Sequence, residues 1–559
     1  MIRKFASRLT RRESIPSPSN GPSSTKVSRS RSVHTGWNTD PDLFRYTRGR
    51  FVSNEAHEMA IRQVNFNMNE LAKRVAESVG STLTQCARVE KFPDGMFNKA
   101  FLFTMQDGTQ VVGKIPNPNA GRAYYTTASE VATMDFVRNH LGTPAPRVLD
   151  WSSKATENPV GAEYIIMEMV TGVQLKTIWP RLDIRERFEV AKSISRYQKA
   201  WMSTLFTQYG SLYYLSDLDY TNPIMHRFAV GPSTGREFLD DGRIVMEFDR
   251  GPWNSVEQYK LAVGRREIAC VQNMSHLPQS PLSLYGPGTY NPSRSKKIAS
   301  LRNYLRVVKY LLPVDKSISS AFLWHPDLHS ENIFVHPERP SEVLGIIDWQ
   351  SSEIMPLFDH ARQPYFLDYN GPSMTGLDPP VFPENFDQLD PAEQAAAQSL
   401  YLKMSLSALY RRFTCATNER LFRAMEFRQT PSFEMMLFAQ NILVDGEALY
   451  RSRMLELEDE WSTLPGVQAA GNPPIPFHFS AGEANAIEED AAGAIKAMEL
   501  MQSLRQSLGN LWPEKGVVSP GQYDEVKTLL DQAKAEIVGP LAHSEKDRMA
   551  WEKSWPYHG

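Results

Sequence analysis

One short stretch constrains the fold of this 559-residue chain more than any other. The sequence HPDLHSENIFVHPERPSEVLGIIDW contains His325 two residues before Asp327, Asn332 five residues after that aspartate, and Asp348 after an apolar run. Phosphoryl transfer uses these residue types, because an aspartate can meet the attacking hydroxyl group while an asparagine and a second aspartate offer oxygen ligands to Mg²⁺. The stretch therefore indicates a phosphoryl-transfer site.

The same stretch predicts a β-hairpin. Residues 333–335 and 343–347 are short apolar runs, and the segment between them holds two prolines, which is typical of a turn between strands. Such a hairpin would place Asn332 at the start of one strand beside Asp348 at the end of the other. Taken singly, each residue also has an ordinary explanation, because aspartate and asparagine commonly cap turns and end strands.

The composition indicates a globular protein with more than one domain-sized unit. The length gives room for two or more domains, and 41% hydrophobic with 22% charged residues is typical of globular chains. The apolar runs are far shorter than the ~18 residues of a membrane span, so we expect no transmembrane segment. Cys86, Cys270 and Cys415 lie far apart without metal-ligand spacing, and we expect structural thiols rather than disulfides.

The N-terminus differs in charge from the rest of the chain. Residues 1–35 carry +7, are rich in serine and arginine, and would place Ile2, Phe5 and Leu9 near one face of a helix. Without a continuous apolar segment, this pattern predicts a disordered mitochondrial presequence read by the import machinery, and hence a mitochondrial location. A basic tail that binds nucleic acid or nothing is the alternative. The whole chain carries −3, so the remainder is acidic, which argues against nucleic acid as a partner of the folded body.

After a helical lead-in at residues 36–80, the pattern changes to strands. Strand-like runs occur at residues 82–92, 100–106 and 109–115. Asp107 and Gly108 are a strong signal for a tight hairpin between the last two runs. The link between the first two contains Gly95 and Asn98. It could cover a nucleotide, with Gly95 letting the backbone approach a phosphate and Asn98 helping to hold the turn, although an ordinary turn fits the same letters.

A lysine in the third of these runs is a candidate phosphate ligand. Lys114 lies in the apolar segment VVGKI, where a charge would be costly unless it meets an anion. Apolar residues at helical spacing predict a helix over residues 128–141, and Glu130 borders its buried stripe, where it could pair with Lys114. The glutamate also fits a capping box that begins at Thr127, which would explain it without any pairing.

Beyond this helix the pattern predicts a mostly helical region. Residues 162–170 read as the last strand of the small lobe, and in a two-lobed kinase Glu168 and Val170 would belong to the hinge that offers backbone groups to adenine. A strand edge followed by a turn is equally compatible. Residues 206–298 read as a loop-rich insertion with one helix, which could cover an acceptor pocket. Further helices are expected over residues 296–312, 392–427, 433–464, 483–511 and 522–538.

In order, these elements are a single-glycine loop, a strand lysine, a helix glutamate, a hinge, the HxDxxxxN series and IIDW. This order resembles the aminoglycoside phosphotransferase and choline kinase family, a branch of the protein-kinase-like fold. The resemblance implies a bilobed α+β protein with a small β-sheet lobe at residues 81–170, a larger, mostly helical lobe at residues 171–465, and a helical extension at residues 466–559. Within this family, the phrases GMFNKAF, SEVATM and HPDLHSENIF are similar to a fungal group of mitochondrial-inheritance proteins.

The resemblance also implies roles for the residues of the central stretch. Asp327 would act as the base or position the hydroxyl group, a contribution of roughly 10²- to 10⁴-fold. His325 would brace the loop that carries this aspartate. Asn332 and Asp348 would hold Mg²⁺.

The remaining implications concern the substrates. Lys114, steadied by Glu130, would bind the phosphates of ATP. DWQ in place of a DFG motif points to a small-molecule kinase rather than a protein kinase. The implied activity is phosphorylation of a small molecule that bears a hydroxyl or amine group, with ATP and Mg²⁺ as cofactors. The alternative is a catalytically idle, kinase-like scaffold that binds nucleotide or partner proteins.

Overall fold

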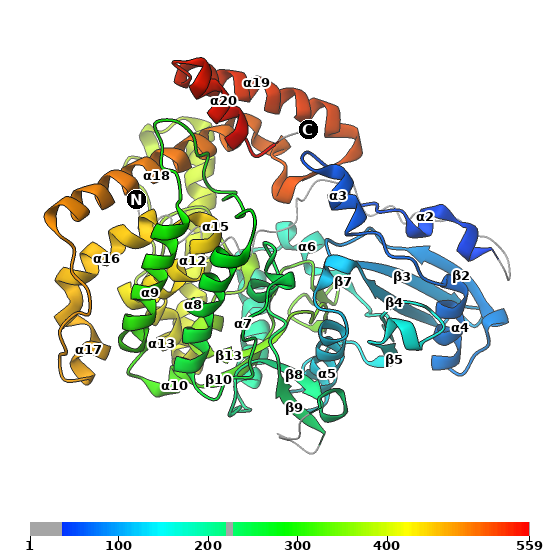
Figure 1. The fold of residues 1–559 in the computed structure, drawn as a ribbon. Coiled ribbons are helices and arrows are strands. Elements are labelled where there is room, and N and C mark those ends of the chain that lie inside the picture. The colour runs from blue at the N-terminus through cyan, green and yellow to red at the C-terminus, as the bar shows by residue number, and fades with distance from the viewer. Residues whose placement is uncertain (1–35, 220–226, 558–559) are drawn as a thin grey trace.

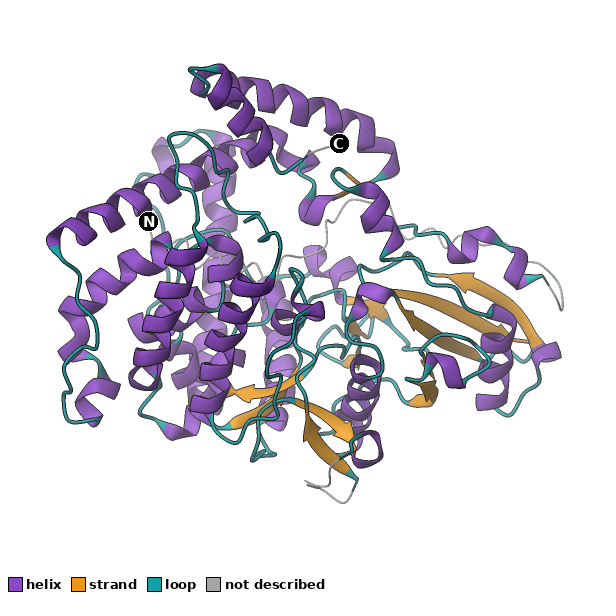
Figure 2. Ribbon diagram, in the orientation of Figure 1, coloured by secondary structure: helices purple, strands orange, loops and turns teal. Residues whose placement is uncertain are grey.

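The computed structural model describes residues 36–219 and 227–557, so the predicted presequence lies outside the described part. Figure 1 shows a small lobe built around a β-sheet beside a larger lobe built of helices, with the last helices lying across the top. Strands dominate only the small lobe and helices make up most of the rest, as Figure 2 shows. The predicted bilobed α+β fold is confirmed.

A five-stranded antiparallel sheet organises the small lobe. In spatial order its strands are β2 (Cys86–Lys91), β3 (Asn98–Met105), β4 (Gln110–Pro116), β6 (Tyr164–Glu168) and β5 (Val148–Ser152). Asp107 and Gly108 make the predicted tight turn between β3 and β4. Gly108 adopts a φ of 88°, and Thr109 donates its backbone N–H to the Asp107 side chain at 2.8 Å. The register pairs Lys114 with Ala100 on one side and Ile165 on the other, in the middle of the sheet.

Two helices flank this sheet, α4 (Met68–Ser78) and α5 (Tyr125–Asn139). Leu71 of α4 shares one buried cluster with Phe103 of β3, so α4 covers a face of the sheet. In Figure 1, α5 lies between the sheet and the large lobe, and its Phe136 meets Phe228 edge to face at 5.3 Å. Because it contributes to the core of the large lobe, α5 holds the two lobes together.

Long helices form the body of the large lobe. They are α7 (Ile184–Trp201), α8 (Val256–Asn273), α9 (Arg294–Leu311), α12 (Pro391–Thr417), α13 (Glu419–Phe427), α14 (Pro431–Ala439) and α16 (Ala448–Glu460). Shorter helices are α2 (Pro41–Phe44), α3 (Glu55–Ala60), α6 (Leu175–Ile178), α10 (Lys316–Ser319), α11 (Leu357–His360), α15 (Ile442–Asp445) and α17 (Pro465–Ala469). Two of the long helices begin at clear N-caps. Asp183 caps α7 and Asp390 caps α12, each in a capping box with the glutamate three residues later.

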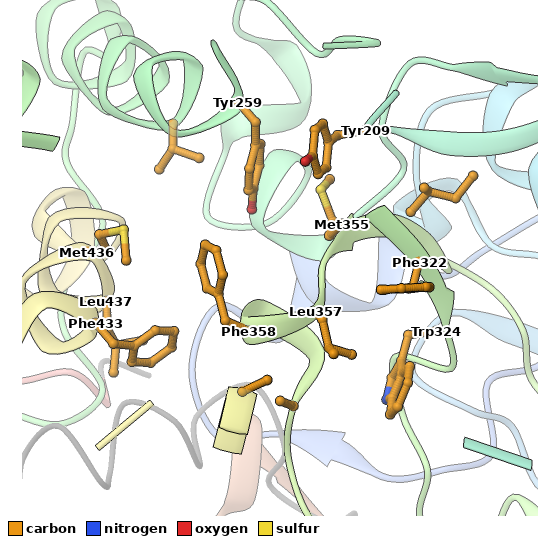
Figure 3. Packing of buried hydrophobic residues seen from close by; sticks show 14 of the residues in the cluster. Tyr209, Tyr259, Phe322, Trp324, Met355, Leu357, Phe358, Phe433, Met436 and Leu437 are labelled. Carbon is orange, nitrogen blue, oxygen red and sulfur yellow. The ribbon is translucent and has the colours of Figure 1, made fainter. Parts of the chain in front are cut away.

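A short antiparallel pair, β10 (Ala321–Trp324) with β13 (Glu353–Pro356), runs through the core of this lobe. Figure 3 shows Phe358, just after β13, with Phe433 and Met436 of α14 on one side and Leu357 and Phe322 on the other. The rings of Phe358 and Phe433 meet edge to face at 6.4 Å. This packing fixes the strand that leads into the HxDxxxxN series and the strand that follows Asp348.

The segment at residues 206–298 is more regular than predicted. Strands β8 (Ser211–Tyr214) and β9 (Phe228–Gly231) pair antiparallel, and α8 packs along α9 in the core of the lobe. Both strands are buried on nearly every residue, so they lack the alternation of polar and apolar residues that marks a half-exposed strand. The segment packs into the large lobe, and its described residues are mostly loops around the one predicted helix, α8; only β8 and β9 were not predicted.

The prediction of a single helix over residues 433–464 is wrong. The chain forms α14, α15 and α16 there, with breaks near Asn441 and at Gly446, whose φ is 90°. Likewise Asn418 separates α12 from α13 and caps α13 by accepting the N–H of Leu421 at 3.4 Å. The helical spacing of apolar residues continues through these breaks. Periodicity alone therefore predicts one long helix where the structure has several shorter ones.

The C-terminal extension contains α18 (Ala481–Leu508), α19 (Tyr523–Leu541) and α20 (Glu545–Ser554), the last of which was not predicted. Between α18 and α19, β14 (Val517–Val518) pairs antiparallel with β1 (Arg50–Phe51) of the lead-in. Within the described residues, every helix is too short or too polar to cross a membrane.

Candidate active site

The hairpin that carries Asn332 and Asp348 forms as predicted. Its strands are β11 (Ile333–Val335) and β12 (Val343–Ile346), and β7 (Val173–Gln174) adds a third strand. Ile347 donates its backbone N–H to the carbonyl oxygen of Asn332 at 2.9 Å, so Asn332 and Asp348 lie at the same end of the hairpin. Asp348 has a φ of 63°, a left-handed conformation that residues other than glycine rarely adopt. Strained positions of this kind cluster at sites where a side chain must be aimed.

Lys114 connects the two lobes through carboxylates. Its Nζ lies 2.7 Å from Oε1 of Glu130 on α5 and 2.9 Å from Oδ1 of Asp348. The side chains of Lys114 and Glu130 are 10% and 4% exposed, whereas that of Asp348 is 40% exposed. Burial alone would lower the pKa of Lys114, but the two carboxylates outweigh it and the pKa is raised. The predicted contact between Lys114 and Glu130 is confirmed.

The capping-box explanation for Glu130 is wrong. α5 begins at Tyr125, before Thr127, and no side chain caps its first turn. Thr127 is buried inside the helix, where its side chain hydrogen-bonds with Glu163. The contact with Lys114 therefore accounts for a glutamate at position 130, and capping does not.

His325 is buried and neutral, and it holds the two halves of the central stretch together. Asp327 donates its backbone N–H to Nδ1 of His325 at 3.1 Å, so the ring proton resides on Nε2, which donates to the carbonyl of Ile347 at 2.9 Å. Burial lowers the pKa of His325, in agreement with this tautomer. The ring also meets Trp349 edge to face at 4.6 Å. These contacts are those of a bracing residue, which is the role predicted for it.

Asp327 presents a charged carboxylate at the surface of the site. Its side chain is 48% exposed, and Oδ1 lies 2.8 Å from Nε2 of His329. Burial would raise the pKa of Asp327, but the hydrogen bond with His329 and the nearby basic side chains outweigh it, and the pKa is lowered. His329 in turn stacks on the ring of Tyr365 at 4.4 Å. The carboxylate is thus both accessible and ionised, as a general base requires.

Asn332 and Asp348 form a donor set that fits Mg²⁺. The side-chain N–H of Asn332 donates to the carbonyl oxygen of Asp327 at 2.8 Å, so its Oδ1 is the atom left to bind a cation. Asp348 uses Oδ1 for Lys114 and keeps a second carboxylate oxygen. No cluster of three or more His, Cys, Asp or Glu side chains suited to a metal occurs in the described part of the chain. One amide and one carboxylate oxygen are few ligands, and they suit an ion that also takes nucleotide phosphates and water.

The loop between β2 and β3 reaches toward this hairpin. Gly95 donates its backbone N–H to the carbonyl of Asn98 at 3.1 Å, which closes the turn. A Cβ on Gly95 would make only ordinary contacts, the nearest 3.6 Å from that carbonyl oxygen, so the turn itself does not require glycine. The side chain of Asn98 does not hold the turn but donates to Oε1 of Gln350 at 2.6 Å, which ties the loop to the segment after Asp348.

The predicted hinge begins at Glu168, the last residue of β6. The carboxylate of Glu168 accepts from Nε and the backbone N–H of Arg147 at 3.0 and 3.1 Å, and it lies 3.4 Å from Arg138. Val170 packs on β12 so closely that a Cβ on Gly345 would lie 2.3 Å from its Cγ1. Their side chains thus have structural partners, and adenine binding by the hinge backbone stays a prediction.

Comparison with known proteins gives the family. The model of the phosphotransferase enzyme family matches residues 88–362. A subtelomeric hrmA-associated cluster protein of Aspergillus fumigatus is 30% identical over 505 residues, which cover 84% of this chain and 97% of that protein. The chain belongs to the phosphotransferase enzyme family.

More distant relatives include the fungal group expected from the sequence. Altered inheritance of mitochondria protein 9 of Yarrowia lipolytica is 23% identical over 497 residues, which cover 80% of this chain and 82% of that protein. The predicted resemblance to that group is confirmed. Among solved structures, the ternary complex of streptomycin, ATP and APH(2")-IIa is 12% identical, covers 66% of this chain and 99% of that one, and has a TM-score of 0.32.

The phosphotransferase family match spans every predicted site residue. Residues 88–362 include the loop with Gly95, the lysine and glutamate of the ion pair, and the hairpin that ends at Asp348. The lead-in before β2 and the helices from α12 onward lie outside this range. What these parts contribute must be inferred from their own contacts.

Two residues of the site were not singled out from the sequence. His329 completes an HxDxH pattern and binds the carboxylate of Asp327, and Gln350, in the DWQ motif, receives Asn98. The letters of both motifs were visible in the sequence. Only the fold shows which atoms they meet.

Proposed function

We propose that this protein is an ATP- and Mg²⁺-dependent phosphotransferase that phosphorylates a hydroxyl or amine group of a small molecule. The observation that supports it most is the position of the Lys114 ammonium between Glu130 and Asp348, at 2.7 and 2.9 Å. These residues come from three separate elements, and the hairpin that carries Asp348 starts beside the loop of Asp327. Phosphoryl transfer needs this combination of a phosphate-binding cation, a metal-binding carboxylate and a base.

The chemistry follows from the contacts of each side chain. Lys114 is already held by buried Glu130, so its contact with half-exposed Asp348 can be exchanged for a nucleotide phosphate without leaving the ammonium unpaired. Bound through Asn332 Oδ1 and Asp348, Mg²⁺ would neutralise phosphate charge. Asp327, held by His325 and Asn332, would accept the proton of the attacking hydroxyl group. Gly95 would let the backbone approach the phosphates, and the hinge at Glu168 and Val170 would receive adenine.

The cellular setting is part of the same proposal. The yeast relative is named as a mitochondrial protein, and residues 1–35 carry the charge and composition of a presequence. We propose import into mitochondria, followed by a lead-in at residues 36–80, a nucleotide-binding lobe at 81–170, a catalytic lobe at 171–465 and an extension at 466–559. A role in mitochondrial maintenance or inheritance would follow from the phosphorylated product.

Calorimetric titration of MgATP into purified residues 36–559 tests the proposal. Wild type should bind, and Lys114→Met should weaken binding by about tenfold or more, because a charge-assisted contact to phosphate is lost. Lys73→Met, on the exposed face of α4, is the matched control and should bind like wild type. No binding of MgATP by the wild-type protein would overturn the proposal.

The alternative is a kinase-like scaffold that binds nucleotide without turnover. It predicts that Asp327→Asn supports normal growth in a strain that lacks the wild-type protein. Profiling of phosphorylated metabolites in mitochondria with and without the protein then separates the two functions. A product that disappears with both the deletion and Asp327→Asn supports the phosphotransferase.

A further inference from the structure

The large lobe contains a cavity of about 480 Å³ beside the site described above. Its wall is formed by the segment at residues 361–375, which follows α11, and by residues of α12, α13, α14 and the turn between the last two. Cavities of this size are typical of sites that bind small molecules. Almost all of the lining residues lie beyond residue 362, where the phosphotransferase match ends, so that match does not account for the cavity.

The cavity adjoins the loop that carries Asp327. Tyr365 lines the cavity, and its hydroxyl group donates to the carbonyl of Pro326 at 3.3 Å. The ring of Tyr365 stacks on that of His329 with 4.4 Å between their centres, and Nε2 of His329 lies 2.8 Å from Oδ1 of Asp327. Two side-chain contacts thus lead from the cavity wall to the predicted base. A molecule in the cavity would lie next to the loop that presents this carboxylate.

The wall of the cavity carries an arginine whose charge is not compensated. Arg428, in the turn between α13 and α14, is partly exposed and donates from Nη1 to the carbonyls of Phe358 and Asp359 at 3.0 and 2.7 Å. Its guanidinium carbon lies 4.3 Å from the centre of the ring of Phe433. These neutral groups fix the side chain but leave its charge. Among the described residues, Arg428 has no ion pair, and its Nη2 is buried without a hydrogen-bond partner, which is rare in folded proteins.

The other charged side chains of the wall have partners within the protein; they are Arg362, Asp368, Arg411 and Glu434. Arg411 of α12 pairs with Glu426 and donates to the carbonyl of Gly376 at 3.0 Å. An oxygen of Glu434 on α14 lies 3.2 Å from Nε of Arg453. The wall thus carries one more cation than anions, and in the described part of the chain the uncompensated charge is that of Arg428.

A helix also begins at this cavity. Thr430 caps α14, Pro431 is its first residue, and both line the wall. The first turn of a helix carries a partial positive charge and favours a negatively charged group nearby. Arg428 precedes the cap by two residues, so the guanidinium and the helix start face the same part of the cavity. A guanidinium without a counter-ion beside a helix start is suited to a phosphate or a carboxylate.

We propose that this cavity binds the acceptor molecule, and that Arg428 and the start of α14 bind an anionic group on it, a phosphate or a carboxylate. The proposal rests on the proposed function and narrows its substrate class. The hydroxyl or amine group of the acceptor would extend past Tyr365 to Asp327. There it would bond to the γ-phosphorus of ATP and lose its proton to Asp327, while the bond from that phosphorus to ADP breaks. An acceptor whose charged groups are all cationic would be repelled by Arg428.

The first test uses anions as probes on purified residues 36–559. Saturating Mg-AMP-PNP occupies the nucleotide site, and inorganic phosphate or acetate is then titrated and followed by calorimetry. The variants are Arg428→Met, Arg428→Lys and Gln429→Glu, of which the last adds a carboxylate at an exposed position of the cavity wall. Arg420→Met on α13 and Gln398→Glu on α12 are the matched controls, because both residues are exposed and lie outside the wall.

At least one of the two anions should bind to wild type. Arg428→Met and Gln429→Glu should each weaken that binding by about tenfold, Arg428→Lys should weaken it less, and the controls should leave it unchanged. Tighter binding of phosphate than of acetate assigns the acceptor group as a phosphate, and the reverse order assigns a carboxylate. No anion binding by wild type, or wild-type affinity in Arg428→Met or in Gln429→Glu, overturns the proposal. Gln429→Glu decides the test if Arg428→Met does not fold.

The second test identifies the acceptor through its product in mitochondria. The phosphorylated metabolite that disappears with Asp327→Asn should carry another anionic group besides the transferred phosphate. It should also fall in a strain with Arg428→Met and stay at the wild-type level with Arg420→Met. A product without a second anionic group overturns the proposal. Failure of the proposed function gives a different result: no metabolite then depends on Asp327, whereas the titration still shows whether the cavity binds an anion through Arg428.

Discussion

Replacing Lys114 with methionine should destabilise the protein, and replacing Glu130 as well should restore part of the loss. Lys114→Met leaves the buried carboxylate of Glu130 beside that of Asp348 without a cation between them. Removing one partner of a buried ion pair costs about 3–5 kcal/mol, because the remaining charge is uncompensated. Glu130→Gln alone should cost less, about 1–2 kcal/mol, since Lys114 keeps Asp348 at 2.9 Å.

The double variant decides whether the two residues are coupled. In Lys114→Met/Glu130→Gln neither charge of the pair is left alone, so it should be about 1–3 kcal/mol more stable than Lys114→Met. Urea unfolding of residues 36–559, followed by tryptophan fluorescence, measures the free energy of unfolding. Lys73→Met is the exposed control and should stay within about 0.5 kcal/mol of wild type. A double variant no more stable than Lys114→Met would refute the reasoning.

The free energy of unfolding of Lys114→Met should also depend on pH in a predictable direction. Burial raises the pKa of Glu130, and Lys114 opposes that shift, so removal of the lysine leaves the pKa higher still. A carboxyl group whose pKa is higher in the folded than in the unfolded state stabilises the fold at low pH. It loses this contribution as the pH rises through its folded-state pKa. Lys114→Met should therefore be less destabilising at about pH 5 than at about pH 8, and the double variant should lack this difference.

Three further predictions address other parts of the molecule. Asp327→Asn should lower kcat by roughly 10²- to 10⁴-fold with MgATP affinity within about twofold, because Lys114 is untouched; unchanged turnover in steady-state kinetics would remove Asp327 as the base. His325→Leu should cost about 1–3 kcal/mol in urea unfolding, since it leaves the carbonyl of Ile347 and the N–H of Asp327 without partners. Wild-type stability of this variant would contradict the bracing role. A fluorescent protein fused to residues 1–40 should enter mitochondria, and exchange of the arginines for glutamine should abolish entry; a wild-type fusion that stays in the cytosol contradicts the presequence.

The parts of the site that could be read from the sequence are those set by local patterns or by the cost of a buried charge. The hairpin of Asn332 and Asp348 follows from two apolar runs and a proline-rich turn, which need no information about distant residues. Lys114 is predictable because an ammonium in an apolar strand needs an anion, and Glu130 because it borders the buried stripe of the predicted helix. Each of these predictions rests on a physical requirement that can be recognised from residues close together in the sequence.

The parts that were missed depend on contacts between distant segments. The pairing of β8 with β9 joins short runs that are buried on nearly every residue, so no alternation marks them. The break at Gly446 interrupts a helical pattern that continues on both sides of it. The contact of the C-terminal extension with the lead-in could not be predicted, because it depends on a two-residue strand whose partner lies more than four hundred residues earlier.

The lead-in connects the loop between β2 and β3 to the C-terminal extension. Asp94, next to Gly95, is fully buried and accepts from the backbone N–H of Thr47 at 2.7 Å, and Lys91 donates to the same carboxylate at 2.8 Å. A few residues further along, β1 pairs with the strand that follows Lys515. The other carboxylate oxygen of Asp94 lies 3.6 Å from Nζ of Lys99, so two lysines and the lead-in surround this buried carboxylate. The lead-in, which the family match does not cover, thus links the loop at Gly95 to the C-terminal extension.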